Sequence, residues 1–195
     1  MTFAGANRPL PSGRVTPATD ALLRPGLLEG VRVLFASAEP PSRFGEAVNS
    51  RCAELRATLG RVVIDPTGDE APPRPETDVL VWDGASLAGP RPVLDGAWLV
   101  LRPVARSAWI ETETPGGKLL LIAPPPADAG AEAARSGLEN LARTLSVEWA
   151  RYGIRTAALL PGAATDPAEL AELAAFLASR AGDYYSGCEF RMGEA

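Results

Sequence analysis

The 195-residue chain has no histidine and only two cysteines, and each shortage removes a class of chemistry. Without histidine, the chain lacks the commonest metal ligand and the side chain that most often acts as a general base. Cys52 and Cys188 lie far apart, without the paired spacing of a zinc site or a disulfide framework, so we expect two small buried residues. Any catalysis would have to use Asp, Glu, Lys, Tyr or Cys side chains.

The chain also lacks long apolar runs and clusters of positive charge. No apolar run approaches the roughly 20 residues that a membrane-spanning helix needs. The first 20 residues have no continuous apolar segment of the kind found in a secretory signal, which predicts a cytoplasmic protein without a membrane partner. The net charge is −5 and no basic stripe is present, which argues against a nucleic-acid partner.

Short apolar runs alternate along the chain with amphipathic stretches. Residues 1–25 mix Pro, Gly, Ser, Thr and Arg without periodicity, which predicts a flexible arm before a single domain at 26–195. The patterns predict strands at 31–36, 61–65, 77–84, 116–126, 153–162 and 188–193, and helices at 46–60, 92–112, 131–151 and 166–179. This alternation indicates a mainly parallel sheet with helices on both faces, a doubly wound α/β fold.

Several residues are expected to set the ends of these helices or to bend them. Gly60 is the predicted stop of the first helix, and Pro103 is expected to kink the second. Asp166 is the predicted N-cap of the last helix, with Pro167 at its first position.

Two segments resemble segments of a known family and follow one another in the same order as in that family. They are "LENLARTLSVEWARYGIRTAALLPG" at 138–162 and "ELAAFLASRAGDYYSGCEF" at 172–190, supported more weakly by "LLEGVRVLFASAE" at 27–39 and "DVLVWDGAS" at 78–86. Together they resemble the short-chain dehydrogenase/reductase family, in particular its ketoacyl-reductase and hydroxyacyl-dehydrogenase members. The resemblance implies a Rossmann-like fold and a nicotinamide-dependent oxidoreductase ancestry.

The residues that carry catalysis in that family are replaced here. The family uses a tyrosine and a lysine four residues later, and Ala131 and Arg135 stand at these positions. Arginine keeps the charge but does not replace lysine in this role. The family's serine should follow the fourth strand, where "APPP" stands at 123–126. The resemblance therefore implies a degenerate member with no catalytic residues.

The cofactor loop and two further segments also depart from the family pattern. A dinucleotide-binding turn needs several glycines, whereas "ASAEPPSRFG" at 36–45 has Gly45 alone, and its prolines remove N–H donors. Only 12 residues separate Asp65 from Asp78, too few for a helix, a strand and a second helix. The last helix follows "LLPGAAT" at once, without room for a substrate lid. We expect a truncated sheet of about six strands, without the adenine-side edge strand or the lid, and no cofactor or metal.

The first functional hypothesis is a non-catalytic subunit that pairs with an active relative, one that acts on a ketoacyl or hydroxyacyl thioester. The resemblance implies dimers built from the two long helices, so the partner would be an active paralogue or a second copy. Trp98, Trp109 and Trp149 are the candidate interface residues, since tryptophan is enriched at interface hot spots. The alternative for each of them is ordinary core packing.

Three other hypotheses stay open at this point. A module binding a small molecule or an acyl thioester could use Arg135, Arg102 and Arg106 against an anion at the carboxyl ends of the strands, although all three could be solvated helix residues. An active NAD(P)-dependent oxidoreductase is less favoured. An enzyme of unusual chemistry would use Asp83, Glu39 or Cys52, yet no spacing pairs these residues with a base or a metal.

Overall fold

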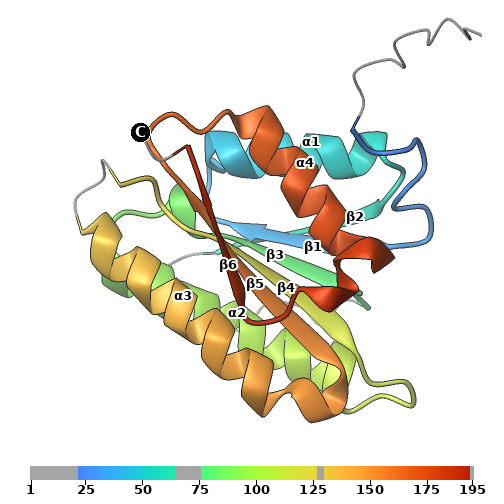
Figure 1. Cartoon of the computed structure of the whole chain (residues 1–195). Helices are drawn as coiled ribbons and strands as arrows, with labels where there is room; N and C mark the ends of the chain where they lie inside the picture. Colours follow the sequence, from blue (N-terminus) through green and yellow to red (C-terminus); the bar gives the residue numbers. More distant parts are fainter. Residues whose placement is uncertain (1–21, 65–75, 127–129, 194–195) are drawn as a thin grey trace, which may run out of the picture.

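The computed structural model describes residues 22–64, 76–126 and 130–193, and within them one sheet of six strands. All neighbouring strands are parallel, in the order β2-β1-β3-β4-β5-β6 (Figure 1). The strands are β1 (Arg32–Ser37), β2 (Thr58–Val63), β3 (Val79–Asp83), β4 (Gly117–Ile122), β5 (Ile154–Pro161) and β6 (Cys188–Met192). The prediction of a parallel sheet of about six strands is confirmed.

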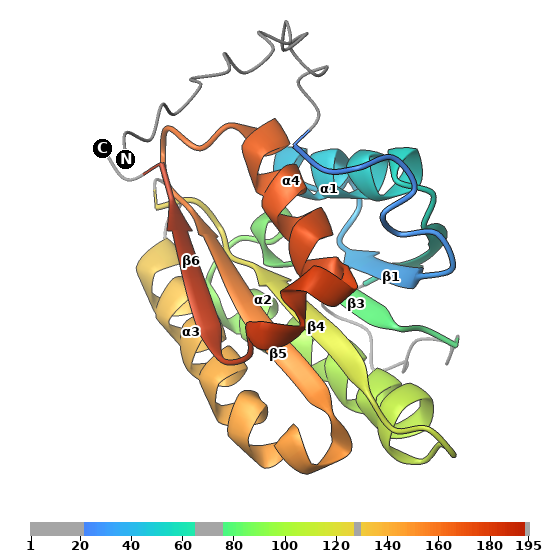
Figure 2. The ribbon, with the colours of Figure 1, turned by 45° about the vertical axis from the view of Figure 1, so that its right-hand side comes forward.

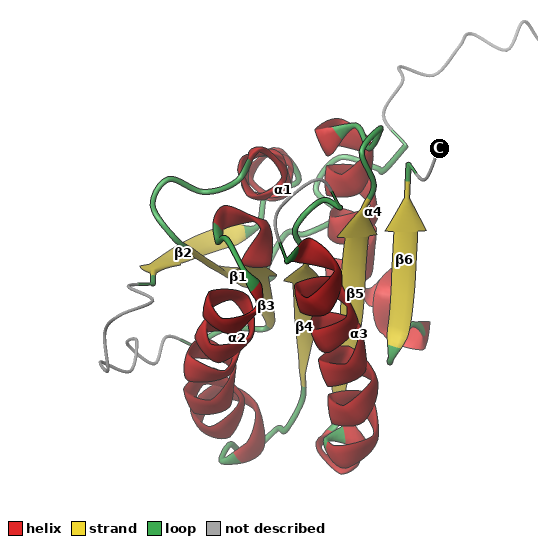
Figure 3. Cartoon of the chain, turned by 90° about the vertical axis from the view of Figure 1, so that its left-hand side faces the viewer, coloured by secondary structure: helices red, strands yellow, loops and turns green. Residues whose placement is uncertain are grey.

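Two helices cover each face of the sheet, as a doubly wound fold requires (Figures 1 and 3). Helices α1 (Arg43–Glu54) and α4 (Pro167–Ala178) pack on one face, and α2 (Pro90–Val104) and α3 (Ala131–Glu148) pack on the other. Short helical turns are η1 (Gly84–Ser86), the π-helical η2 (Ala105–Ile110), η3 (Ala150–Tyr152) and η4 (Arg180–Tyr184). Among the described helices, none is both long and apolar enough to cross a membrane.

The strands are apolar on both faces because both faces are covered. Every residue of β3 is buried, and its side chains alternate between two hydrophobic clusters. Leu80 and Trp82 pack beneath α2 and α3, whereas Val79 and Val81 pack beneath α1 and α4. This arrangement explains why the sequence shows continuous apolar runs rather than alternating ones.

The predicted boundary between the first helix and the second strand is wrong. Helix α1 ends at Glu54, and Gly60 lies within β2 instead of ending the helix. The helix ends because Arg56 adopts a left-handed conformation, with φ of 70°. The N–H of Ala57 then donates to the carbonyl of Cys52 (3.0 Å), the bond that defines a Schellman C-cap. An arginine occupies the position usually held by glycine, so the sequence carried no glycine signal there.

Pro103 marks a change of helix type rather than a simple kink. Helix α2 ends at Val104 and passes directly into the wider turn of η2. Proline has no N–H to donate to the carbonyl four residues earlier, that of Leu99. The Ser107 hydroxyl donates to the Pro103 carbonyl (2.8 Å) at the start of the wider turn. The wider turn brings Trp109 into the core, where it is fully buried.

The connection between β5 and α4 has the shortened form expected from the sequence. Strand β5 passes to α4 through residues 162–166, with no inserted lid in this described stretch. Asp166 caps α4 as predicted, accepting a hydrogen bond from the N–H of Ala168 (2.9 Å). Strand β2 forms one edge of the described sheet. The predicted arm at 1–25 and the proline-rich linker before Asp78 fall largely outside the described residues, at 1–21 and 65–75.

Candidate functional site

In a doubly wound sheet the expected ligand crevice lies at the carboxyl ends of the strands, where the strand order reverses. Here the reversal falls between β1 and β3, which end at Ser37 and Asp83. These two residues are paired in the parallel register and both are fully buried. The chemistry of this edge therefore depends on what surrounds Ser37 and Asp83.

The loop after β1 is held by side chains rather than by a ligand-cradling glycine turn. The Ser86 hydroxyl accepts a hydrogen bond from the N–H of Ala38 (2.9 Å) and donates to the carbonyl of Asp83 (2.7 Å). Ser42 then acts as the N-cap of α1, accepting from the N–H of Gly45 (3.0 Å). The loop is thus tied to η1 and closes directly onto the first turn of α1.

Asp83 places its carboxylate at the N-terminus of α1. One oxygen accepts from the backbone N–H of Ser42 (2.8 Å), and the other accepts from the Ser42 hydroxyl (2.7 Å). A Cβ atom at Gly45 would lie only 2.2 Å from the Asp83 carboxylate, so the close approach requires glycine there. A helix N-terminus favours an anion. In this chain that position is filled by the protein's own carboxylate.

This carboxyl group gives stability an unusual pH dependence. Burial raises the pKa of Asp83 above its ordinary value, although hydrogen bonds from Ser42 oppose the rise. A carboxyl with a raised folded-state pKa favours folding as the neutral acid, so this contribution is complete below the ordinary pKa and is lost as pH rises through the raised value. We expect the free energy of unfolding of the wild type, minus that of Asp83→Asn, to fall as pH rises above the ordinary pKa of an aspartate.

Urea unfolding at a series of pH values measures this difference, and Asp78 supplies a control of opposite sign. Hydrogen bonds from the Arg32 guanidinium lower the pKa of Asp78, so the advantage of the wild type over Asp78→Asn should shrink as pH falls. A difference for Asp83→Asn that rises with pH would contradict the buried, desolvated position of this carboxyl.

The residues at the family's tyrosine and lysine positions also lie at the carboxyl end of the sheet. Ala131 is buried in the first turn of α3, after Gly130 with φ of 75°. Arg135 is buried one turn later, and its Nη1 donates to the carbonyls of Pro124 (2.9 Å) and Pro161 (2.7 Å). The expectation of a solvated helix residue is wrong for Arg135, because its guanidinium joins the chain segments that follow β4 and end β5.

The three arginines considered for an anionic ligand do not converge. Helix α2 starts at the carboxyl ends of the strands, where Pro90 meets Gly130, and it runs toward the amino ends, where Trp109 meets Gly117. Arg102 and Arg106 therefore lie toward the opposite end from Arg135. Both are exposed, and Arg106 pairs with Glu111 (2.7 Å).

Asp83, Glu39 and Cys52 occupy separate surroundings. Glu39 is exposed and pairs with Arg61 across the β2 edge (2.6 Å). Cys52 lies inside the core beneath α1, where burial raises the pKa of its thiol to about 12. A thiol with this pKa is protonated at neutral pH and is a poor nucleophile. The expectation of a buried Cys52 is confirmed, whereas Cys188 is only half-buried.

The three candidate interface tryptophans differ in exposure. Trp109 is fully buried and its indole N–H donates to the carbonyl of Thr77 (2.8 Å), so its assignment to an interface is wrong. Trp149 is partly buried against the core beneath α2 and α3. Trp98 on α2 is 44% exposed and stays a candidate. It is accompanied by two more exposed apolar residues on these helices, Leu99 and Val147.

One described cavity lies at the other end of the sheet from the expected crevice. It has a volume of about 340 Å³ and is lined mainly by polar side chains, including those of Arg32, Asp78, Ser107 and Thr112. The carboxylates of Glu76 and Asp78 both pair with Arg32 at its rim. These two carboxylates outnumber the one guanidinium, so the charges of the lining do not favour an anionic ligand.

Solved structures show the same fold. A citronellol catabolism dehydrogenase of Pseudomonas aeruginosa PAO1 matches with a TM-score of 0.67 at 22% identity, covering 89% of this chain and 97% of the other. A gluconate 5-dehydrogenase of Burkholderia cenocepacia J2315, solved with NADP and tartrate, matches with a TM-score of 0.66 at 20% identity, covering 85% and 94%. The chain has the fold of these dehydrogenases. A 2-keto-3-deoxy-D-gluconate dehydrogenase of Streptococcus agalactiae matches with a TM-score of 0.64 at 16% identity, covering 84% and 92%.

By sequence, no protein-family model and no curated protein matches the chain. The similarity to dehydrogenases is therefore found by comparing structures and not by these comparisons of sequence. Sequence reasoning missed the Ser42–Asp83 contact, although Ser42 stands three residues before Gly45 in the spacing of an N-cap. It also missed the burial of Arg135, which shares a helix face with Ala131 and Leu138.

Proposed function

We propose that the chain is a non-catalytic subunit with a dehydrogenase fold that pairs with an active dehydrogenase/reductase of the same fold, one acting on a ketoacyl or hydroxyacyl thioester. The active partner would supply the tyrosine, the lysine and the glycine-rich cofactor loop. This chain would supply a stable surface that holds the partner in its working conformation.

This proposal rests on one observation. The protein's own side chains fill the carboxyl ends of the strands, where a ligand would otherwise bind. Asp83 occupies the N-terminus of α1, where a dinucleotide phosphate would need to approach, and its carboxyl oxygens already accept hydrogen bonds from the N–H and the hydroxyl of Ser42 there. The Arg135 guanidinium donates hydrogen bonds to two backbone carbonyls of the protein itself. Ala131 has no group that can transfer a proton. These contacts support a scaffold better than they support hydride transfer.

The pairing surface is supported by the outer faces of α2 and α3, which lie side by side across one face of the sheet (Figure 3). Gly137 allows the two helices to approach, since a Cβ there would lie 2.7 Å from the Leu94 side chain. Trp98, Leu99 and Val147 are 44%, 38% and 76% exposed on these helices. Exposed aromatic and aliphatic groups of this kind are the usual anchors of a protein interface.

The test is recovery of the partner with the tagged chain from its host, followed by the native mass of the complex. We expect a stoichiometric assembly containing a dehydrogenase that has the tyrosine and lysine of the family. Trp98→Ala combined with Leu99→Ala should lower recovery at least tenfold, because truncating an interface anchor commonly costs about 2 kcal/mol. Tyr184→Ala is the matched control, an exposed aromatic residue on η4, and should leave recovery unchanged.

Two outcomes would overturn the proposal. One is recovery of the chain alone under conditions in which the tagged protein is folded. The other is oxidation or reduction of a nicotinamide cofactor by the purified chain without a partner.

A second candidate is a binding module for a small molecule or an acyl thioester at the carboxyl edge. It is favoured by the Ser37 hydroxyl at the end of β1, which is buried and has no hydrogen-bond partner among the described residues. Buried polar groups normally have partners, so a polar guest could supply one. A rise in melting temperature with an acyl thioester, in the absence of any protein partner, would favour this function.

A further inference from the structure

The polar cavity lies at the amino ends of β1 and β3, at the end of the sheet where η2 passes into β4 (Figure 2). Its volume of about 340 Å³ falls within the range of small-molecule sites. Asp83 and Arg135 lie at the opposite, carboxyl end of the sheet. None of the described residues that line the cavity belongs to the outer faces of α2 and α3, so a ligand and a protein partner can bind independently.

The π-helical turn η2 forms one wall of this cavity. Ser107 and Ala108 lie on the turn, and both line the cavity. The N–H of Glu111 donates to the carbonyl of Arg106 (2.9 Å), which is the five-residue spacing of a π-helix. Turns of this type are rare and occur frequently at functional sites. The wider turn is thus a second feature of this end of the sheet that is typical of a binding site.

The lining of the cavity carries an excess of negative charge. The Arg32 guanidinium donates to both carboxylate oxygens of Asp78 (2.7 and 3.0 Å), and it also pairs with the Glu76 carboxylate at the mouth. One positive charge therefore faces two negative charges, and a positively charged ligand would balance them.

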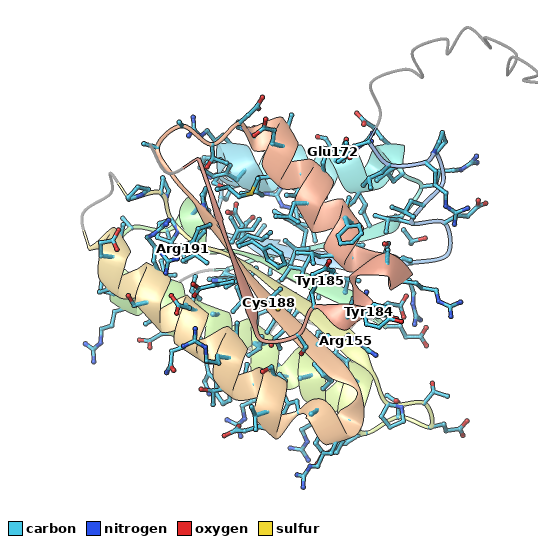
Figure 4. The ribbon with its side chains drawn as sticks, in the orientation of Figure 1. Arg155, Glu172, Tyr184, Tyr185, Cys188 and Arg191 are labelled. Carbon is cyan, nitrogen blue, oxygen red and sulfur yellow. The ribbon has the colours of Figure 1, made fainter. Side chains whose placement is uncertain are left out.

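Two further cations at the amino ends of the strands are engaged on the other face of the sheet. Lys118 of β4 pairs with the Asp183 carboxylate (2.6 Å) and donates to the carbonyl of Leu177 in α4 (3.0 Å). Arg155 of β5 donates to the carbonyl of Asp183 (2.7 Å), on the turn that carries Tyr184 (Figure 4). Neither cation offsets the negative charge of the cavity by direct contact with its carboxylates.

The Thr112 side chain supplies an unpartnered polar group at the cavity wall. Its hydroxyl oxygen is buried and has no hydrogen-bond partner among the described residues, although Thr112 lines the cavity. Buried polar groups normally have partners. Rotation about a single side-chain bond would turn this hydroxyl toward the cavity, where its oxygen can accept a hydrogen bond from a ligand.

A second, mainly apolar cavity adjoins the polar one. It has a volume of about 210 Å³ and shares Arg32, Glu76 and Thr77 with the first. Its remaining lining comes from β1 and β2 and includes Leu34 and Leu59. The two cavities therefore meet at the Arg32–Glu76 ion pair, with hydroxyl groups on one side and aliphatic side chains on the other.

We propose that these adjoining cavities bind a small amine that carries a short alkyl chain. The ammonium group lies against the Glu76 carboxylate and donates to the hydroxyl oxygens of Ser107 and Thr112, while the alkyl chain extends over Leu34 and Leu59. An ammonium group has only hydrogen-bond donors, which suits a lining that offers oxygen acceptors and excess negative charge. Burial of the alkyl chain against the aliphatic side chains adds to the affinity.

Binding of hexylamine, followed by nuclear magnetic resonance, tests the proposal. We expect saturable shifts of the Ser107 and Thr112 amide signals. Hexan-1-ol and hexanoate keep the alkyl chain without the positive charge, so each should bind about tenfold more weakly. Ethylamine keeps the ammonium group without most of the chain and should also bind more weakly than hexylamine. Absence of saturable hexylamine binding to the folded chain would overturn the proposal, as would equal binding of hexanoate.

Three variants locate the amine on the chain. Glu76→Gln removes the excess charge at the exposed mouth and should weaken hexylamine binding about threefold. Thr112→Val keeps the shape of the side chain without its hydroxyl and should weaken binding about fivefold. Glu111→Gln is the matched control, because Glu111 is at the same end of the sheet but does not line the cavity. Equal affinities of all three variants, each folded by circular dichroism, would contradict the assigned site.

Discussion

Replacing Trp109 with alanine is expected to lower the free energy of unfolding by about 3–5 kcal/mol. The indole is fully buried and packs against Gly117, where a Cβ atom would lie 2.3 Å from the ring. Its N–H also donates to the carbonyl of Thr77, which would lose its partner. The substitution removes apolar contact, leaves a cavity and leaves a buried carbonyl unsatisfied. Urea unfolding followed by circular dichroism measures the loss.

Trp98→Ala is the matched control for this prediction, since it removes the same side chain from the helix that leads into η2. Trp98 is 44% exposed, so its loss should change stability by less than about 1 kcal/mol. The two variants should also differ in the recovery of the partner. Trp98→Ala should lower recovery by weakening the contact itself, whereas Trp109→Ala should lower it only by unfolding the chain. Equal costs of unfolding for the two variants would contradict the core position of Trp109.

Arg135→Met should lower the free energy of unfolding by about 3 kcal/mol. The guanidinium donates two hydrogen bonds to the carbonyls of Pro124 and Pro161, and hydrogen bonds to charged groups contribute about 1.5–3 kcal/mol each. Methionine keeps much of the volume but none of the donors. Both carbonyls would then be left without this donor at the edge of the sheet. Arg135→Lys should recover only part of the loss, because one ammonium does not reproduce the planar fork.

Arg143→Met on the same helix provides the comparison. Arg143 is 61% exposed and pairs with Glu139 (2.9 Å), an arrangement that contributes about 0–1 kcal/mol. A helix-propensity effect would move both variants together, since arginine and methionine are similar helix formers. A loss for Arg135→Met no larger than that for Arg143→Met would show that the guanidinium does not join the segments around β4 and β5.

The order of strands and helices could be predicted because both faces of the sheet are covered. Continuous apolar runs such as that of β3 indicate a buried parallel strand, and the spacing of Asp166 and Pro167 predicts the start of α4. The end of α1 could not be predicted, because Arg56 takes the left-handed conformation that glycine usually signals. As a result, the predicted start of the second strand, residue 61, lies three residues after the observed start of β2 at Thr58.

The candidate site was harder to predict because its decisive contacts join distant residues. Asp83 and Ser42 are 41 positions apart, and only the sheet brings the end of β3 to the start of α1. Arg135 reaches the carbonyl of Pro161, 26 positions away. For Trp109, the π-helical turn after Pro103 shifts the helical phase, so a regular periodicity does not show which face is buried.

The short connection between β5 and α4 bears on how quickly the chain can bind. The Thr165 hydroxyl accepts from the N–H of Gly162 (2.8 Å) and donates to the carbonyl of Met192 (2.7 Å), which fastens this connection to β6. Because this connection is already fixed, it loses little conformational entropy when the chain binds a partner. Association at this end of the sheet then needs no closing of the connection, as in protein pairs whose preformed surfaces meet by diffusion at roughly 10⁵–10⁷ M⁻¹s⁻¹.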